Sequence, residues 1–431
     1  MKVAITNTVA LNGGDAAILL CLVRMVRKAF GEDVEIIVFD SQPEIAARYY
    51  PGFTFRLLEM LPAPLPKRRL RRLDRLLERV ERVRFRTALR LLPVGLGSLL
   101  LRHSERRLVR QYAEMDLVIA TGGTYLVENY DIGFRLGHFG LAQAAGTPVM
   151  LFTQSLGPFR KPRNRRSVKR VLSGARRILL RDARSRTHLI DAGVPESLMH
   201  ICADGVFALA DDVRLNAAAE GGRLPGQRLR VAISVREWSH FGSETPGSGM
   251  DRYCRAIAAV VEHLSREFDA EIVFLSTCQG IPEYWTDDSR TAARISELVA
   301  PELRDRVVVD RSFRRPDQLM EAYSGFDLLV STRLHAAILA LCAGTPVFPI
   351  EYEFKTTEVF AKLGLRDWIQ DINTVQADTL PAKLGSFMRV LPALRGTLFR
   401  AVLSERDSAF QAVEVLADGF QSPGRLPAGA R

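Results

Sequence analysis

The sequence lacks the features of a secreted or membrane-spanning chain. Cysteine is scarce, with five residues among 431, and these are scattered without a C-x-x-C pair. No apolar run approaches the roughly 20 residues that a membrane helix needs. The first residues, MKVAITNTVA, have no basic or apolar signal-peptide region and instead indicate a strand. We therefore expect a cytoplasmic protein whose thiols are buried and reduced, at Cys21, Cys202, Cys254, Cys278 and Cys342.

Several ligand-binding motifs are also missing. The chain has no P-loop, which needs G-K-[ST], and no G-x-G-x-x-G segment. Histidines and carboxylates are not grouped at the spacing of metal ligands, so we expect no metal site. What is present is an ordinary folded composition, 47% hydrophobic and 25% charged. A chain of this length is too long for one core and predicts two domains.

Positive charge is concentrated in two stretches of a chain whose net charge is +11. Residues 67–90 hold eleven basic and three acidic residues, and residues 160–186 hold twelve basic and one acidic. The first stretch is typical of an amphipathic basic helix, because apolar residues recur at helical spacing at Leu70, Leu73, Leu77 and Val80. Three interpretations fit it: a solvated helix packed on its own domain, a surface for anionic membranes, or a nucleic-acid contact. We expect no nucleic-acid partner.

Short apolar strands alternate with helices along the chain, which predicts α/β architecture with parallel sheets covered on both faces. Strands are expected at 2–6, 35–40, 116–121, 148–155, 177–182 and 200–203, and again at 230–236, 271–277, 306–310, 328–331 and 346–350. The fold class is two doubly wound Rossmann-like domains facing a cleft. The expected domains are 1–210 with a basic helical insertion at about 62–110, a polar linker at 211–228, a second domain at 229–375, and C-terminal helices with a frayed tail at 376–431.

Two glycine segments follow strands of the first domain. Asn12-Gly13-Gly14-Asp15 stands where a loop enters a helix, and glycines there let backbone N–H groups approach an anion. Asp15 is either a helix N-cap or a carboxylate that accepts a hydroxyl proton. Gly122-Gly123 follows the strand at 116–121 and is either a tight turn or a set of backbone donors for a ligand.

In the second domain, cationic side chains follow the strands. Arg236 ends an otherwise apolar strand, where burial without an anionic partner is costly, so it is salt-bridged or reserved for an anionic ligand. Arg333 and His335 stand where a strand hands over to a helix, which suits a planar cation and a proton donor beside an anion. Lys355 either reaches the same pocket or is a solvated lysine. These residues predict a site for a small phosphorylated or carboxylated ligand.

The chain resembles the polysaccharide pyruvyl transferase family. The resemblance rests on six segments in order over residues 1–370: NGGDAAIL, DLVIATGGTYL, RDARSRTHLIDAGV with ICADGVFAL, VAISVRE, DLLVSTRLHAAILALCAGTPVF and EYEFKTTEVFAKLGL. It implies a GT-B-like fold, phosphoenolpyruvate as co-substrate without a cofactor, and a cyclic pyruvate ketal formed on a pair of sugar hydroxyls. It also implies that Arg236, Arg333, Leu334 and His335 surround the phosphoenolpyruvate. The family's three glycines are here Thr121-Gly122-Gly123.

From this resemblance we expect His335 to be the general acid or the phosphate partner and Asp15 the base at the acceptor hydroxyl. Arg236 and Arg333 would hold the two anionic groups, and Lys355, Asn12, Gly13, Gly14, Gly122 and Gly123 would complete substrate binding. The acceptor in such systems is a lipid-linked oligosaccharide, which gives the basic helix a role at the inner face of the membrane.

Two other functions remain open. One is a nucleotide-sugar glycosyltransferase on the same fold, although Glu351, Glu353 and Glu358 lack the E-x7-E spacing expected for a ribose site. The other is a non-catalytic anion- or glycan-binding protein.

Overall fold

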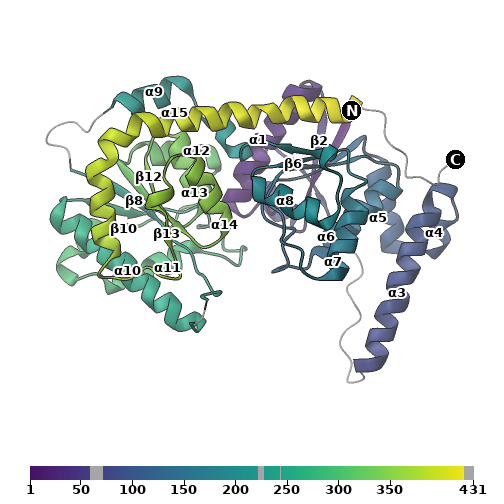
Figure 1. Cartoon of the computed structure of the whole chain (residues 1–431), viewed down its shortest axis with the longest axis horizontal. Coiled ribbons are helices and arrows are strands. Elements are labelled where there is room, and N and C mark those ends of the chain that lie inside the picture. Colours follow the sequence, from purple (N-terminus) through teal and green to yellow (C-terminus); the bar gives the residue numbers. More distant parts are fainter. Residues whose placement is uncertain (59–70, 222–227, 243, 422–431) are drawn as a thin grey trace. The chain divides into compact units, whose positions relative to one another are not determined.

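The structure is a computed structural model that describes residues 1–58, 71–221, 228–242 and 244–421. The chain divides into two compact units (Figure 1). Unit 1 contains residues 1–9, 22–202 and 410–431, and unit 2 contains residues 10–21 and 203–409. The loop at Asn12–Asp15 therefore groups with the second unit, although it follows the first strand in sequence.

Unit 1 is built on one parallel sheet of seven strands in the order β3-β2-β1-β4-β5-β6-β7. Neighbouring residues Leu117, Val118, Ile119 and Ala120 of its central strand are all fully buried, so both faces are covered, as the apolar runs predicted. The strands are β1 Lys2–Thr6, β2 Glu35–Asp40, β3 Thr54–Leu57, β4 Leu117–Ala120, β5 Val149–Gln154, β6 Arg177–Leu180 and β7 Met199–Ile201.

Helices α5 to α8 pack their apolar residues on one face of this sheet, against Ala4, Phe39, Val118 and Leu151. Helix α1 begins in unit 2 and continues in unit 1. The helices of this part are α1 Gly13–Phe30, α2 Pro43–Tyr49, α3 Arg71–Leu91, η1 Leu92–Val94, α4 Gly97–Leu100, α5 His103–Ala113, α6 Ile132–Ala144, α7 Pro162–Leu172, α8 Ala183–Ala192 and η2 Glu196–Leu198.

Unit 2 has a six-stranded parallel sheet in the order β10-β9-β8-β11-β12-β13. Its strands are β8 Arg230–Ser234, β9 Glu271–Phe274, β10 Val307–Val309, β11 Leu328–Ser331, β12 Val347–Glu351 and β13 Gln370–Asp371. Its helices are η3 Gly205–Leu209, α9 Asp212–Glu220, α10 Pro246–Glu267, α11 Asp288–Leu298, η4 Pro301–Arg306, α12 Pro316–Ser324, α13 Leu334–Cys342, α14 Phe354–Lys362, η5 Arg366–Trp368 and α15 Leu380–Gln421.

Three sequence expectations need correction. In the stretch at 211–228, expected as an interdomain linker, the described residues 211–221 lie within unit 2 and contain helix α9, which Asp211 caps by accepting from the Arg214 N–H at 2.9 Å. The C-terminal part is a single long helix, α15, rather than several, and residues 422–431 lie outside the described part. Strands β3 and β13 were not expected from the sequence, because each is short and lies at a sheet edge.

From Arg71 on, the basic insertion is mainly helical, as predicted. Its apolar stripe is only partly used for packing, because Ala88 is buried whereas Leu77 and Val80 are 39% and 54% exposed. The side chains of Leu70 and Leu73 lie outside the described residues. Packing on the domain therefore explains the C-terminal end of α3 and leaves its middle apolar residues in contact with solvent. None of the helices in the described ranges is long and apolar enough to cross a membrane.

All five cysteines are free and buried, which confirms the predicted environment of the thiols. Cys202 lies in unit 1, and the other four lie in unit 2. Their burial raises the pKa of each thiol for which a shift is resolved, for example to about 11 for Cys254 and Cys278. Cys254, Cys278 and Cys342 therefore stay protonated near neutral pH and act as small apolar side chains.

His138 in α6 predicts a pH dependence of stability. Burial, with a smaller effect of Arg135, lowers the pKa of its imidazole to about 4. In the unfolded chain the imidazole of His138 takes up a proton near pH 6.5. The full unfolding free energy is therefore present above pH 6.5, and it falls as the pH drops toward 4. Between pH 7 and pH 5 we expect the wild type to lose about 2 kcal/mol more unfolding free energy than His138→Gln, as measured by urea unfolding at both pH values. An unchanged pH dependence in this variant would mean that His138 is not held neutral.

Candidate functional site

The candidate site lies at the carboxyl ends of strands β8, β11 and β12 in unit 2. Parallel strands end at the same edge of a sheet, and ligands of open α/β sheets bind there. Arg236 follows β8, Arg333 and His335 follow β11, and Lys355 follows β12. The loop before α1 joins them, because Gly14 lies against His335. The structure therefore brings together within one unit most of the residues that the sequence singled out.

The loop at Asn12–Asp15 packs too closely for side chains at its glycines. A Cβ on Gly13 would lie 2.2 Å from the backbone oxygen of Thr277, and one on Gly14 would lie 2.7 Å from Nδ1 of His335. Oδ1 of Asn12 accepts from the N–H of Gly14 at 3.0 Å and of Asp15 at 3.4 Å. Asn12 is therefore the capping residue of α1, and the N-cap interpretation of Asp15 is wrong.

His335 is held by a carboxylate that the sequence reading missed. Its Nε2 lies 3.4 Å from Oδ2 of Asp204, whose side chain is fully buried, while the imidazole itself is 14% exposed. Oδ1 of Asp204 accepts from the N–H of Val206 at 3.0 Å. A buried carboxylate on Nε2 fixes the orientation of the imidazole, and it leaves Nδ1 on the side of Gly14.

Arg333 is paired with Asp288 rather than presented as an open fork. Its Nε and Nη2 donate to the two carboxylate oxygens at 2.9 Å and 2.5 Å, and Ser276 donates to the same carboxylate at 2.5 Å. Burial opposes the charge of Arg333, but Asp288 outweighs it and raises the pKa of the guanidinium. Asp288 therefore engages two of the five N–H donors of Arg333, and the whole guanidinium is not open to a ligand as expected.

Arg236 and Lys355 lie over the ring of Tyr352. The guanidinium carbon of Arg236 is 3.9 Å and the ammonium of Lys355 is 5.2 Å from the ring centre. Burial opposes ionisation of Tyr352, but the charges of Arg236 and then Lys355 prevail and lower the pKa of the phenol. Lys355 also pairs with Glu353 at 2.8 Å. The cations that the sequence indicated are thus gathered on one aromatic residue, which the sequence did not single out.

Tyr284 also contacts the loop at Asn12–Asp15. Asn12 donates from Nδ2 to the Tyr284 hydroxyl at 3.3 Å. Burial raises the pKa of this hydroxyl, and the nearby Cys278 and Asp15 add to the effect. Tyr284 therefore keeps its proton near neutral pH and stands beside Asp15 as a hydrogen-bond donor.

The remaining predicted residues have other surroundings. The side chain of Leu334 is 3% exposed and packs in the core, so only its backbone is available at the start of α13. Gly122 and Gly123 belong to unit 1. Gly123 has φ +126°, and its oxygen accepts from the N–H of Ser155 at 2.9 Å. This bond is part of a parallel bridge between Gly123 and Gln154, which continues the pairing of β4 with β5.

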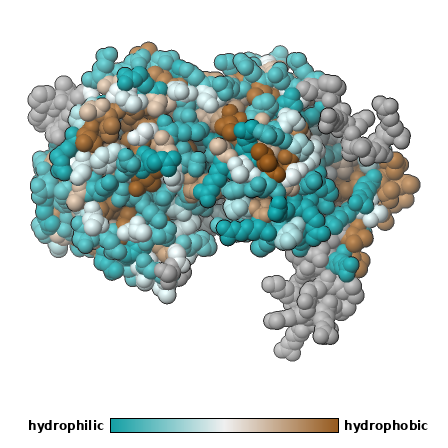
Figure 2. All heavy atoms as spheres, viewed as in Figure 1, coloured by the Kyte–Doolittle hydropathy of each residue, from teal (hydrophilic) through white to brown (hydrophobic). Residues whose placement is uncertain are grey.

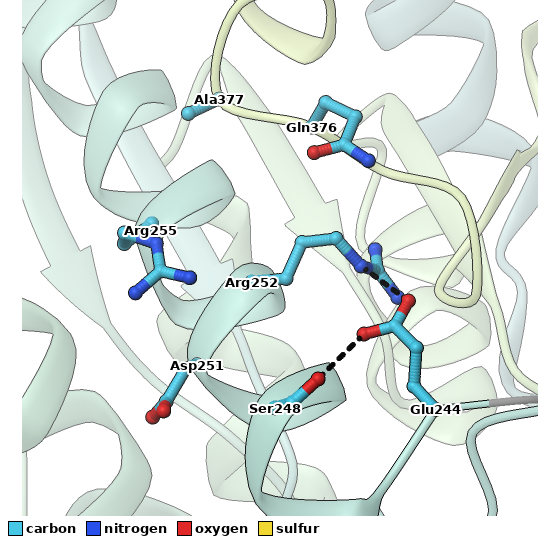
Figure 3. Close-up of a pocket in the computed structure, with 7 residues that line it drawn as sticks. All are labelled: Glu244, Ser248, Asp251, Arg252, Arg255, Gln376 and Ala377. Atoms are coloured by element: carbon cyan, nitrogen blue, oxygen red, sulfur yellow. Dashed lines mark hydrogen bonds and ion pairs between the residues drawn. The ribbon is translucent and has the colours of Figure 1, made fainter.

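A separate cavity of about 310 Å³ in unit 2 is lined by charged residues (Figure 3). Its charges are largely satisfied internally, because Glu244 accepts from Nε of Arg252 at 2.9 Å and from Ser248 at 3.2 Å. Arg252 also donates to the backbone oxygens of Ile372 and Val375. None of the predicted site residues lines this cavity, so the cavity is separate from the candidate site.

No group of three metal-ligating side chains is found within the ranges that the structure describes. What the strand ends offer instead is a histidine with a carboxylate partner, a cationic group on Tyr352, and a glycine loop. This set can hold a small dianionic ligand and deliver a proton to it.

Substitutions at Gly13 and Gly14 are expected to affect stability and activity differently. Gly13→Ala brings a methyl group onto the Thr277 backbone, so we expect a loss of about 1–3 kcal/mol in unfolding free energy. Gly14→Ala meets a side chain, so we expect it to displace His335 and lower activity more than stability. Gly242→Ala is the control, because nothing lies within 4 Å of that position. Equal behaviour of all three variants in urea unfolding would contradict the close packing of the loop.

Comparison with known proteins gives a consistent result. The family model described as polysaccharide pyruvyl transferase matches residues 12–353. The chain is 29% identical over 309 residues to the amylovoran biosynthesis protein AmsJ of Erwinia amylovora, which covers 69% of this chain and 71% of that protein.

Solved structures agree on the fold. HepE of Anabaena, in complex with UDP-glucose, is similar with a TM-score of 0.56 and 14% identity, covering 97% of this chain and 100% of that one. UDP-GlcNAc 2-epimerase of Neisseria meningitidis is similar with a TM-score of 0.54 and 10% identity, covering 96% and 99%. The two-sheet architecture is therefore GT-B-like, as predicted.

Proposed function

The chain belongs to the polysaccharide pyruvyl transferase family, and from that premise we propose that it moves the pyruvate unit of phosphoenolpyruvate onto a hexose. The acceptor is a sugar of an exopolysaccharide or another cell-surface glycan, in a lipid-linked intermediate. The product is a cyclic pyruvate ketal, and phosphate is released. The observation that carries the proposal is the His335–Asp204 pair beside the cationic group on Tyr352.

Phosphoenolpyruvate carries a phosphate and a carboxylate, and both need cationic partners when they leave water. Arg236 and Lys355 supply two cations, both close to the ring of Tyr352. Arg333 contributes through the N–H groups that Asp288 does not engage, and its pairing keeps it in a fixed position. Arg236 is therefore our first choice for the phosphate and Lys355 for the second anionic group.

His335 is the proton donor in this proposal. Transfer of its proton to the methylene carbon converts the double bond to a methyl group and leaves a cationic centre at the ketal carbon. One sugar hydroxyl adds there with loss of its proton, and the carbon–oxygen bond to phosphate breaks. A second hydroxyl then closes the ring and gives its proton to the imidazole of His335, which restores the donor. Asp204 stabilises the imidazolium before the transfer, and Asp15 accepts a proton from the acceptor.

The proposal is tested by phosphate release. The enzyme is mixed with phosphoenolpyruvate and a panel of aryl and lipid-linked glycosides, and thermal shifts are recorded with phosphoenolpyruvate and with nucleotide sugars. We expect stabilisation by phosphoenolpyruvate and phosphate release with one acceptor. Stabilisation by UDP-glucose alone would favour the glycosyltransferase alternative, which the UDP-glucose complex of HepE keeps under consideration. Binding without turnover on any acceptor would favour a non-catalytic glycan-binding protein.

No cofactor, metal or nucleic acid enters this proposal. We place the reaction in the cytoplasm at the inner face of the membrane, where a lipid-linked acceptor would be met. Binding of the acceptor through Gly122 and Gly123, and the boundaries of an acceptor domain at 1–210, stay predictions.

A further inference from the structure

A cavity of about 620 Å³ lies in unit 1 between helices α3, α6 and α7, outside the site described above. Its lining combines cationic side chains with an apolar wall. The cations are Arg86, Arg90, Arg163 and Arg170, and the wall includes Phe85, Leu89, Pro93, Val94, Leu136 and Val171. Neither aspartate nor glutamate lines it. Its volume is in the range of pockets that hold small organic ligands.

The hollow exists because α6 presents small residues toward it. Gly133, Gly137, Gly140 and Ala144 follow one another at helical spacing and all line the cavity. A Cβ on Gly140 would make only an ordinary contact of 3.6 Å with Leu89. A larger side chain there would extend into the cavity rather than into packed atoms, which gives an uncharged way to fill it.

None of the four arginines has an acidic partner among the residues that the structure describes. Burial lowers the pKa of Arg170, and the charges of Arg86 and Arg90 lower it further. All four side chains are exposed, so water partly screens their mutual repulsion, and an anion placed among them would offset the repulsion that remains. The cavity is therefore complementary to an anion with an apolar part.

Exposed apolar side chains continue from the cavity over the neighbouring elements. Val94, which lines the cavity, is 65% exposed, and Leu96, Leu99 and Leu100 of the η1–α4 region are exposed as well. Figure 2 shows hydrophobic surface gathered over α4, at the right-hand end of the view. Leu77, Val80 and Val83 of α3 are also exposed. Such a patch beside cations is typical of a membrane-facing surface.

We propose that this cavity binds the phosphate headgroup and the adjoining hydrocarbon of an anionic lipid in a membrane leaflet. The arginines hold the phosphate, the apolar wall holds the start of the chain, and the exposed leucines of α4 contact the leaflet around it. The apolar wall favours a lipid over a free phosphate, and the depth of the cavity favours a single lipid over a nucleic-acid backbone. The proposal is independent of the pyruvyl transfer chemistry.

Binding of decyl phosphate to the full chain tests the pocket, measured by calorimetry below its micelle concentration. We expect saturable binding that weakens at least about tenfold in Arg90→Gln/Arg170→Gln, because two charge-assisted contacts are lost. The control Arg79→Gln/Arg110→Gln removes the same charge from exposed positions outside the lining, and it should keep the affinity within about twofold. Equal weakening in both variants would overturn the proposal in favour of general electrostatic attraction.

Further measurements separate the possible ligands. Gly140→Leu fills the cavity without changing charge and should weaken decyl phosphate binding as strongly as the double arginine change. If inorganic phosphate bound as tightly as decyl phosphate, the site would be one for a soluble anion. If the uncharged decyl maltoside bound as tightly, the arginines would not contribute to recognition. In flotation, phosphatidylcholine vesicles containing phosphatidic acid should carry the wild type and the control variant, but neither pocket variant. A dimer that these pocket variants abolish would instead assign the surface to a second copy of the chain.

Discussion

Replacing His335 with glutamine is expected to lower kcat for ketal formation by about 10²- to 10⁴-fold, with a much smaller effect on stability. Glutamine keeps a polar group near Asp204 but cannot deliver a proton to carbon. The imidazole is partly exposed and its only recorded polar contact in the described structure is Asp204, so few packing contacts are lost. The measurement is phosphate release at saturating phosphoenolpyruvate, with urea unfolding of the same preparation.

The partner of His335 gives a matched variant. Asp204→Asn keeps the shape of the carboxylate but removes the charge that favours the imidazolium. Since Asp204 acts through His335, we expect the alkaline limb of the pH–rate profile, where the proton donor is lost, to move to lower pH. A reduced rate with an unmoved profile would show that Asp204 is merely structural. Full activity of His335→Gln would remove the histidine from the mechanism altogether.

Removing the charge of Asp288 is expected to cost about 3–5 kcal/mol of unfolding free energy, because Arg333 is left buried without a partner. In Asp288→Asn the guanidinium keeps its position, 11% exposed, but loses the carboxylate that compensates its charge. The double variant Asp288→Asn/Arg333→Gln should recover much of the loss, since it removes the unpaired charge. The measurement is a double-mutant cycle in urea.

An exposed pair provides the control for this cycle. Arg294 and Asp251 form an ion pair in which both side chains are about half exposed. We expect Arg294→Gln to cost less than about 1 kcal/mol, because water screens such pairs. Additive losses in the Asp288–Arg333 cycle would contradict the coupling that the bidentate geometry implies.

Much of the fold could be predicted because buried parallel strands are continuous apolar runs. The expected strands at 2–6, 35–40 and 328–331 coincide with β1, β2 and β11. The predictions failed where that signal is absent. Strand β3 is partly exposed and mixed in composition, and the stretch at 211–228 is polar yet contains α9, whose cap at Asp211 reads equally well as loop chemistry.

The sequence predicted the cationic residues of the site but not their carboxylate partners. Arg236, Arg333 and His335 could be found because polar side chains follow apolar strands. Their partners could not, since Asp204 is 131 residues from His335 and Asp288 is 45 residues from Arg333. Only the fold joins such distant positions. Asp204 lies in the segment ICADGVFAL, where a polar residue within an apolar run was the available signal.

The central claim is that this chain protonates the methylene carbon of phosphoenolpyruvate during transfer to a sugar. The most direct test is to run the reaction with the identified acceptor in deuterium oxide and to examine the product by mass spectrometry and NMR. The account predicts a pyruvate ketal whose methyl group carries one solvent deuterium, together with released phosphate. A glycosylated product formed from a nucleotide sugar, with phosphoenolpyruvate left unchanged, would contradict it.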